Sequence, residues 1–386
     1  MSAGFPGEAF KQPLTLIVLF GLVASQEQRS SVAQELVVPA ETVTASTFDA
    51  SRIEGHAKCV DCHAQEIKAW RASKHATRAF DLLRTAPTSI EYAKKLGIRP
   101  TDIARNSLCT TCHATQQRDD AGRLRVLSGV SCEACHNGSG GEDGWLNAHA
   151  AYGPRGTRRE EESVDHYARR TATCEKAGQF RSANAYQLVK RCFECHVVGN
   201  EALAEAGHDH GDGFEFVTKA LGEVRHNFFL DRQSNAEVAT LWTDSLHHGS
   251  GRNAAGRKRV LFVLGQLVDL EISLRNLATA TDENDFSDLM IERIEDAWGL
   301  LVEDLLEELT ETALPEVEEA TKAVEPILEK LDDDGFAPAD AKLYLAAATI
   351  VGKAAKQFAT RNGNDLKELD DLDLLPEGPF EGVVQP

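Results

Sequence analysis

Eight of the nine cysteines in this 386-residue chain stand in four pairs, and a histidine directly follows each pair. The four units read CVDCH (59–63), CTTCH (109–113), CEACH (132–136) and CFECH (192–196). Two thiols one helical turn apart can add across the two vinyl groups of a haem, and the next residue then presents its imidazole to the iron. Zinc sites and redox dithiols also use Cys-x-x-Cys, but neither requires this histidine in every unit. The spacing therefore predicts four covalently attached haem c groups.

Each unit supplies two attachment thiols and one proximal iron ligand. The attachment residues are Cys59, Cys62, Cys109, Cys112, Cys132, Cys135, Cys192 and Cys195. The proximal ligands are His63, His113, His136 and His196. Cys174 is left over, and we expect it to be a small buried residue; an intermolecular disulfide or a reactive thiol is the alternative.

The residue on the far side of each iron decides whether that iron is open to substrates. Methionine is nearly excluded, because the chain has only Met1, in the expected signal segment, and Met290, in an acidic helical region. The irons should therefore be bis-histidine or, in part, five-coordinate. The histidines outside the motifs are His56, His75, His149, His166, His208, His210, His226, His247 and His248.

His75 lies twelve residues after His63, in a segment (64–83) that lacks Pro and Gly and has helical apolar spacing. On one straight helix the two side chains would be about 18 Å apart along the axis. They could not then bind one iron from opposite faces. We expect His75 to serve a different haem from His63, with a solvated surface histidine as the alternative.

The elements that must position these residues are mostly helical. Residues 137–144 (NGSGGEDG) read as a loop, and the pattern is again helical from residue 256 onward. An apolar stripe at helical spacing includes Phe286, Met290, Ile294, Trp298, Leu301, Leu305 and Leu309. Further helices are expected at 315–331, with a kink at Pro326, and at 342–358. We predict a mainly α fold: a multihaem cytochrome c domain with little regular sheet, then a C-terminal α-helical bundle.

The net charge of −20 argues against non-specific nucleic-acid binding. Its distribution is uneven: residues 51–200 hold 23 Lys and Arg against 17 Asp and Glu, whereas residues 281–340 hold 3 against 21. The acidic bundle surface is expected to be solvated, or to attract basic redox partner proteins.

The N-terminus is typical of an export signal, because Lys11 precedes an apolar run of twelve residues (13–24) and small residues. This run is short for a membrane span, although an uncleaved anchor is the alternative. We therefore predict an exported, periplasmic protein with no membrane span after signal removal. The expected organisation is a signal peptide (1–33), a linker (34–51), a tetrahaem domain (52–232), the acidic bundle (233–375) and a tail (376–386).

The segment from residue 52 to 200 resembles the tetrahaem cytochrome c-554 family. The resemblance rests on Glu54-Gly55 before the first unit, then Trp70, Ser73 and His75-Ala76, and on the run SGVSCEACH (128–136). It implies a mainly α-helical fold around closely packed haems and a role in electron transfer.

The resemblance also implies crossed ligation. His75 would serve the third haem, held by His136, and His149 would serve the first, held by His63, while the second haem, held by His113, would be five-coordinate. The chain departs from the family before the fourth unit, where residues 184–192 contain no histidine. His208 and His226 are the candidates to replace that ligand, and His56 is expected to be structural.

These expectations favour an electron carrier that passes electrons between redox partners through mostly bis-histidine haems. If both His208 and His226 bind iron, no iron is open. If only one binds, the His113 haem could act as an enzyme site that reduces or oxidises a small nitrogen compound. A subunit of a larger complex, with the bundle as interface, is a third hypothesis.

Overall fold

The computed structural model describes residues 49–119, 121–158, 161–181, 185–211, 213–221, 229–230, 237–238 and 254–377. These residues all belong to one compact unit, Val43–Pro386. The predicted signal peptide, most of the linker, His226, His247 and His248 lie outside the described residues.

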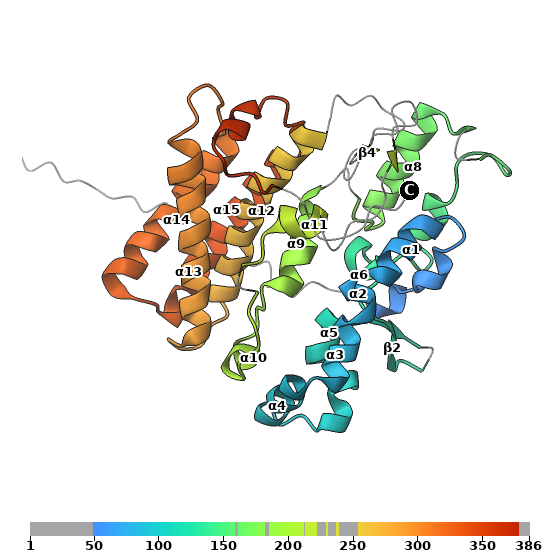
Figure 1. The fold of residues 1–386 in the computed structure, drawn as a ribbon, viewed down its shortest axis with the longest axis horizontal. Helices are drawn as coiled ribbons and strands as arrows, with labels where there is room; N and C mark the ends of the chain where they lie inside the picture. The colour runs from blue at the N-terminus through green and yellow to red at the C-terminus, as the bar shows by residue number, and fades with distance from the viewer. Residues whose placement is uncertain are drawn as a thin grey trace, which may run out of the picture. The chain divides into compact units, whose positions relative to one another are not determined.

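The predicted mainly α fold is confirmed (Figure 1). The part of the chain that carries the four motifs contains short helices: α1(Ala64–Ala72), α2(Lys74–Thr77), α3(Ala79–Thr85), α4(Pro87–Lys95), α5(Ser107–His113), α6(Cys132–His136), α7(Trp145–His149), α8(Val164–Lys176), α9(Ala185–His196), α10(Glu201–Glu205) and α11(Phe216–Leu221). The 3-10 turns η1(Ala50–Arg52), η2(His56–Lys58) and η3(Pro100–Arg105) lie between them. Many short helices joined by turns can wrap around large prosthetic groups more closely than a few long ones.

Regular sheet is limited to two antiparallel pairs in the described part of the chain. In the first, β1(Thr115–Arg118) pairs with β2(Leu124–Ser128), with a register shift between Thr115 and Gln116. In the second, β3(Phe229–Leu230) pairs with β4(Glu237–Val238). This agrees with the expectation of little regular sheet.

The single straight helix expected over 64–83 is wrong, because the chain turns at Ser73. The backbone of Ser73 is extended (φ −77°, ψ 158°), and its Oγ accepts a hydrogen bond from the backbone N–H of Ala76. The same hydroxyl donates to the carbonyl of Trp70 at 2.7 Å. Ser73 thus ends α1 and caps α2, as serine often does at a helix start. His75 therefore points in a direction that a straight helix would not give it.

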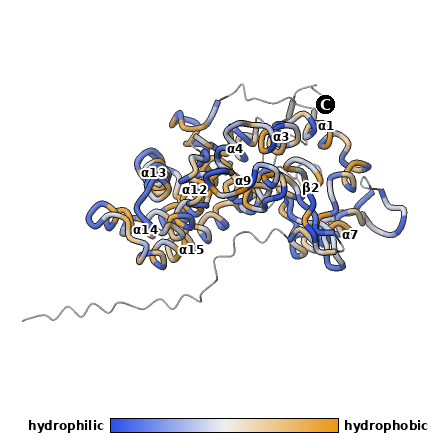
Figure 2. The backbone as a smooth tube through the Cα atoms, turned by 90° about the horizontal axis from the view of Figure 1, so that it is seen from below, coloured by the Kyte–Doolittle hydropathy of each residue, from blue (hydrophilic) through white to orange (hydrophobic). Residues whose placement is uncertain are grey.

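The C-terminal part is a bundle of longer helices. They are α12(Ala254–Leu277), α13(Asp285–Gly299), α14(Pro315–Asp334) and α15(Ala341–Phe358), with the π-helical turn η5(Leu300–Leu306) and the 3-10 turns η6(Pro338–Asp340) and η7(Lys367–Asp371). Apolar and polar stretches alternate along these helices (Figure 2). Phe286, Met290 and Ile294, from the predicted stripe, are fully buried, so the stripe is core.

One apolar core joins α9, which carries the fourth haem motif, to the bundle. Val189 and Phe193 of α9 belong to the same buried cluster as Leu264 and Leu267 of α12. Beside this core, the buried carboxylate of Glu271 accepts hydrogen bonds from two residues of α9 and one of α12. The donors are the Tyr186 hydroxyl at 2.8 Å, Lys190 Nζ at 2.6 Å and Arg275 Nε at 2.8 Å. The bundle therefore holds the helix of the fourth motif in place.

Among the described residues, no helix combines the length and the apolar character needed to cross a membrane.

Candidate haem-binding site

Each Cys-x-x-Cys-His unit sits on a helical turn, which places both thiols on one side and the histidine next to them. In the first unit the backbone N–H of His63 donates to the carbonyl of Cys59 at 2.9 Å, as in an α-helix. The second and fourth units end α5 and α9, and the third unit makes up the whole of α6. This is the local geometry that attachment to two vinyl groups needs.

Histidines distant in sequence face each other in pairs. A metal–imidazole bond is about 2 Å long, so two imidazoles on opposite sides of one iron have ring centres about 6 Å apart. The ring centres of His63 and His149 lie 5.8 Å apart, with their planes 24° from parallel. The spacing fits an iron between them, and it agrees with the pairing that the family resemblance implied.

His75 lies against His196, with ring centres 5.9 Å apart and planes at 86°. The resemblance implies that His75 serves the haem of His136, whereas the structure brings His75 to the fourth motif. The physical reason is the turn at Ser73, which redirects the chain just before His75. His63 and His75 face different partners, as expected.

His208 lies against His113, with ring centres 6.1 Å apart and planes at 70°. The resemblance implies an open iron at His113, and His208 is one of two candidates for the fourth haem. The structure brings His208 to the second motif, and its role as an iron ligand stays a prediction. His208 follows α10 and packs beside Tyr92 of α4 at 5.7 Å, and these contacts carry it to the second motif.

Hydrogen bonds to Nδ1 leave the other ring nitrogen, Nε2, available for a metal. His113 Nδ1 lies 3.1 Å from the Ala79 carbonyl, His136 Nδ1 lies 2.8 Å from the Phe180 carbonyl, and His208 Nδ1 lies 2.6 Å from the Asp209 carbonyl. Metal-bound histidines usually donate their second N–H to such acceptors. His226, the other predicted ligand, is outside the described residues, so its role stays a prediction.

Burial favours the neutral form of His149 and His196, and neutral imidazole is the form that binds metals. Burial, with a smaller effect of nearby His63, lowers the pKa of His149 to about 3. Burial and then the neighbouring His75 lower the pKa of His196 to about 4.

Glu133 lies inside the third motif and links it to the chain just before the first motif. The sequence alone predicted no role for Glu133. Its carboxylate is 1% exposed and accepts the backbone N–H groups of Glu54 at 3.0 Å and Gly55 at 2.6 Å. It also accepts the N–H and hydroxyl of Ser139, at 2.9 and 2.6 Å. The sequence did contain a pointer to this contact, because Glu54-Gly55 and the Cys132-Glu133 pair are both elements of the family resemblance.

The remaining elements of the resemblance also contact one another. Trp70 Nε1 donates to the carbonyl of Val130 at 2.7 Å. A Cβ atom on Gly129 would stand 2.4 Å from the His75 carbonyl oxygen, so only glycine fits there. These contacts hold the segment before the third motif against the chain that carries His75.

The thiols show which motifs are neighbours. The Cys59 side chain lies beside that of Cys132, which joins the first and third motifs, and Cys112 lies beside Cys195, which joins the second and fourth. Burial and then the nearby charge of Cys135 raise the pKa of Cys192, so the third and fourth motifs are also close. The motifs thus follow the spatial order first, third, fourth, second.

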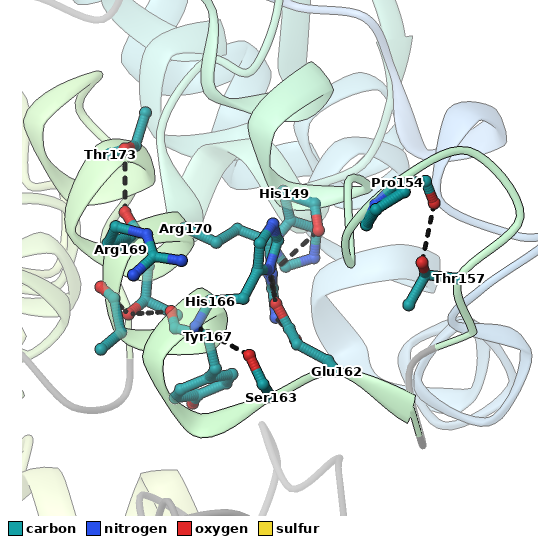
Figure 3. Close-up of polar contacts among 12 residues, drawn as sticks. His149, Pro154, Thr157, Glu162, Ser163, His166, Tyr167, Arg169, Arg170 and Thr173 are labelled. Atoms are coloured by element: carbon teal, nitrogen blue, oxygen red, sulfur yellow. Dashed lines mark hydrogen bonds and ion pairs between the residues drawn. The ribbon is translucent and has the colours of Figure 1, made fainter.

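Three other predicted side chains have structural contacts. His56 packs on Trp70 with ring centres 4.7 Å apart. His166 Nδ1 lies 2.6 Å from the buried Glu162 carboxylate, which also binds Arg170 (Figure 3). Cys174 is fully buried, with its Sγ 3.8 Å from the Trp145 carbonyl, in keeping with the expected packing role.

Comparison with known proteins identifies one family. Neither the curated proteins nor the solved structures include a match. Residues 58–137 match the family model described as cytochrome c554 and c-prime. This segment contains the first three motifs and the Trp70 and Gly129 elements. The resemblance found in the sequence is therefore confirmed over residues 58–137, and a match to a cytochrome c family implies covalently bound haem c.

Proposed function

We propose that the chain is an exported tetrahaem c-type cytochrome that carries electrons between redox partners. The observation that carries this proposal is the set of facing imidazoles, with ring centres 5.8, 5.9 and 6.1 Å apart, beside Cys-x-x-Cys-His units. Bound haem supplies one-electron redox chemistry. Two imidazoles on one iron leave no position for a substrate, which suits a carrier.

The contacts between motifs support a continuous path for electrons through the four haem sites. Close spacing of redox groups favours electron transfer between them, and the thiol contacts join first to third, third to fourth and fourth to second motif. Electrons would then enter or leave at the first and second motifs, which are the ends of this order. The first motif is the more accessible of these two ends, because Cys62 is exposed whereas the other seven attachment cysteines are partly buried.

The bundle offers a surface for a basic redox partner. Nine carboxylates are exposed along α13 and the turns after it: Asp285, Asp288, Glu292, Glu295, Asp296, Glu303, Asp304, Glu307 and Glu308. Opposite charge on a partner would raise the association rate, and salt would weaken this effect. Export to the periplasm rests on the N-terminal segment and on the family.

Spin state tests the proposal. The three facing pairs should be low-spin in the oxidised protein. Imidazole planes near 24° should give a more rhombic electron paramagnetic resonance (EPR) spectrum than planes at 70° or 86°. The alternative, an enzyme acting on a small nitrogen compound at the His113 haem, needs an open iron there. Carbon monoxide binding to the reduced unmodified protein, with a high-spin component in its oxidised form, would favour the enzyme over the carrier.

A further inference from the structure

The segment 177–180, after α8, connects the ligands of two different motifs. Phe180 accepts from His136 Nδ1 through its carbonyl, and its own N–H donates to the His136 carbonyl at 3.1 Å. The preceding residue, Gln179, reaches the opposite way, toward His149. Two adjacent residues therefore contact a proximal ligand of the third motif and the facing histidine of the first.

The backbone of this segment is held firmly. The Gln179 N–H donates to the Cys174 carbonyl at 2.9 Å, and Arg52 and the Asn137 amide donate to the carbonyls of Ala177 and Gly178, both at 3.0 Å. The Gln179 side chain is 8% exposed. It is thus a fixed buried amide and not a surface group that happens to meet a histidine.

The side-chain amide of Gln179 has one satisfied end and one unsatisfied end. Its Nε2 lies 3.3 Å from His149 Nδ1, whereas its Oε1 is buried and has no hydrogen-bond partner. The two ends of an amide have nearly the same shape, so their assignment follows from the hydrogen bonds they make. With Nε2 facing Nδ1, the imidazole would have to carry its proton on Nε2, and that nitrogen could not bind iron.

Exchanging the two ends removes the conflict with iron binding. Oε1 then accepts the Nδ1–H of His149 and is no longer a buried acceptor without a donor, while His149 Nε2 is left unprotonated toward His63. Arg170 fixes the same histidine from another side, since its Nη1 donates to the His149 carbonyl at 3.0 Å (Figure 3). Trp145 packs edge-on against the imidazole, with ring centres 5.5 Å apart.

We propose that Gln179 is a positioning residue for the first haem: its Oε1 accepts the Nδ1–H of His149, fixes the tautomer and orientation of that ring, and increases its basicity as a ligand. This inference rests on the proposed function, since it takes His149 as an iron ligand. An acceptor on Nδ1 makes imidazole a stronger donor and favours the oxidised iron. Removing the acceptor should therefore raise the reduction potential of this haem, and a carboxylate acceptor should lower it.

The experiment uses the full-length protein with its haems attached, and compares Gln179→Leu, Gln179→Glu and the control Cys174→Ala. Cys174 is buried in α8 and its carbonyl accepts the Gln179 N–H, while its Sγ lies near the Trp145 carbonyl. A redox titration followed by EPR identifies the first haem by its near-parallel rings. We expect a shift to higher potential in Gln179→Leu, a shift to lower potential in Gln179→Glu, and no shift in Cys174→Ala. High-spin iron in Gln179→Leu alone would also support the proposal, because His149 would then have lost its orientation.

Two outcomes overturn the proposal: an unchanged potential and spin state in Gln179→Leu, or the same change in Gln179→Leu and Cys174→Ala, which would indicate packing. Shifts of Gln179→Leu and Gln179→Glu in the same direction would overturn it as well. A separate variant, His149→Ala, tests the ligand itself. If its first haem stays low-spin, the proposed ligation fails, whatever Gln179 does.

Discussion

Replacing Glu271 with Ala should loosen the helix that carries the fourth haem motif. The carboxylate is fully buried and is the shared acceptor of Tyr186, Lys190 and Arg275. Breaking a buried ion pair by removing one partner costs about 3–5 kcal/mol. The side chains of Lys190 and Arg275 are 20% and 30% exposed, so both can regain water. We therefore expect the lower end, about 3 kcal/mol of unfolding free energy.

The assay is denaturant unfolding of the holoprotein, followed by helix content and by haem absorbance. Glu318→Ala is the matched control, because it removes a carboxylate from an exposed pair with Lys322, whose side chains are 49% and 71% exposed. Such a surface pair is worth at most about 1 kcal/mol. Equal losses in the two variants would refute the reasoning.

Gly352 of α15 lies close to Glu271 and gives a second test of this buried carboxylate. Alanine normally stabilises a helix interior relative to glycine by about 1 kcal/mol. Here a Cβ atom at residue 352 would stand 2.7 Å from the Glu271 carboxylate carbon. Gly352→Ala should therefore destabilise the protein, and should be harmless or stabilising once Glu271 is Ala. Additive effects of the two substitutions would contradict this coupling.

Two further predictions concern a ligand and a titrating group. His75→Ala should make the His196 haem high-spin and leave the His63 haem low-spin. Magnetic circular dichroism together with EPR distinguishes high-spin from low-spin haem. A high-spin His63 haem would contradict the pairing of His75 with His196. Hydrogen bonds from Thr310 and its neighbours lower the pKa of Glu368 to about 2. A lowered pKa stabilises the fold above the unfolded value of about 4.3, and this contribution is lost as pH falls toward 2. Unfolding midpoints of wild type and Glu368→Gln should therefore differ at pH 6 and converge near pH 2, whereas a constant difference would rule this out.

Local spacing made the haem motifs and the bundle helices predictable. The Cys-x-x-Cys-His units are contiguous in sequence, and the stripe from Phe286 to Leu309 repeats at the helical period. The pairing of histidines was less accessible, because it depends on where the chain turns. Ser73 shows why: one capping serine breaks an otherwise helical pattern and redirects His75.

The contacts that support the motifs were harder to foresee, since most use backbone atoms. The Phe180 carbonyl on His136 leaves no trace in residue type. Glu133 and Gly129 could be found only through the family resemblance, and the structure supplies their physical reason: one collects backbone N–H groups, and the other lets two chain segments meet.

The haem content of the mature protein tests the central claim most directly. A pyridine haemochrome spectrum, together with the protein concentration, gives the number of haems per chain and shows whether both vinyl groups are bonded to cysteine. The account predicts four haems per chain, one for each Cys-x-x-Cys-His unit, all attached by two thioethers. A protein that matures with fewer haems, or with metal ions in place of haem at these units, would contradict it.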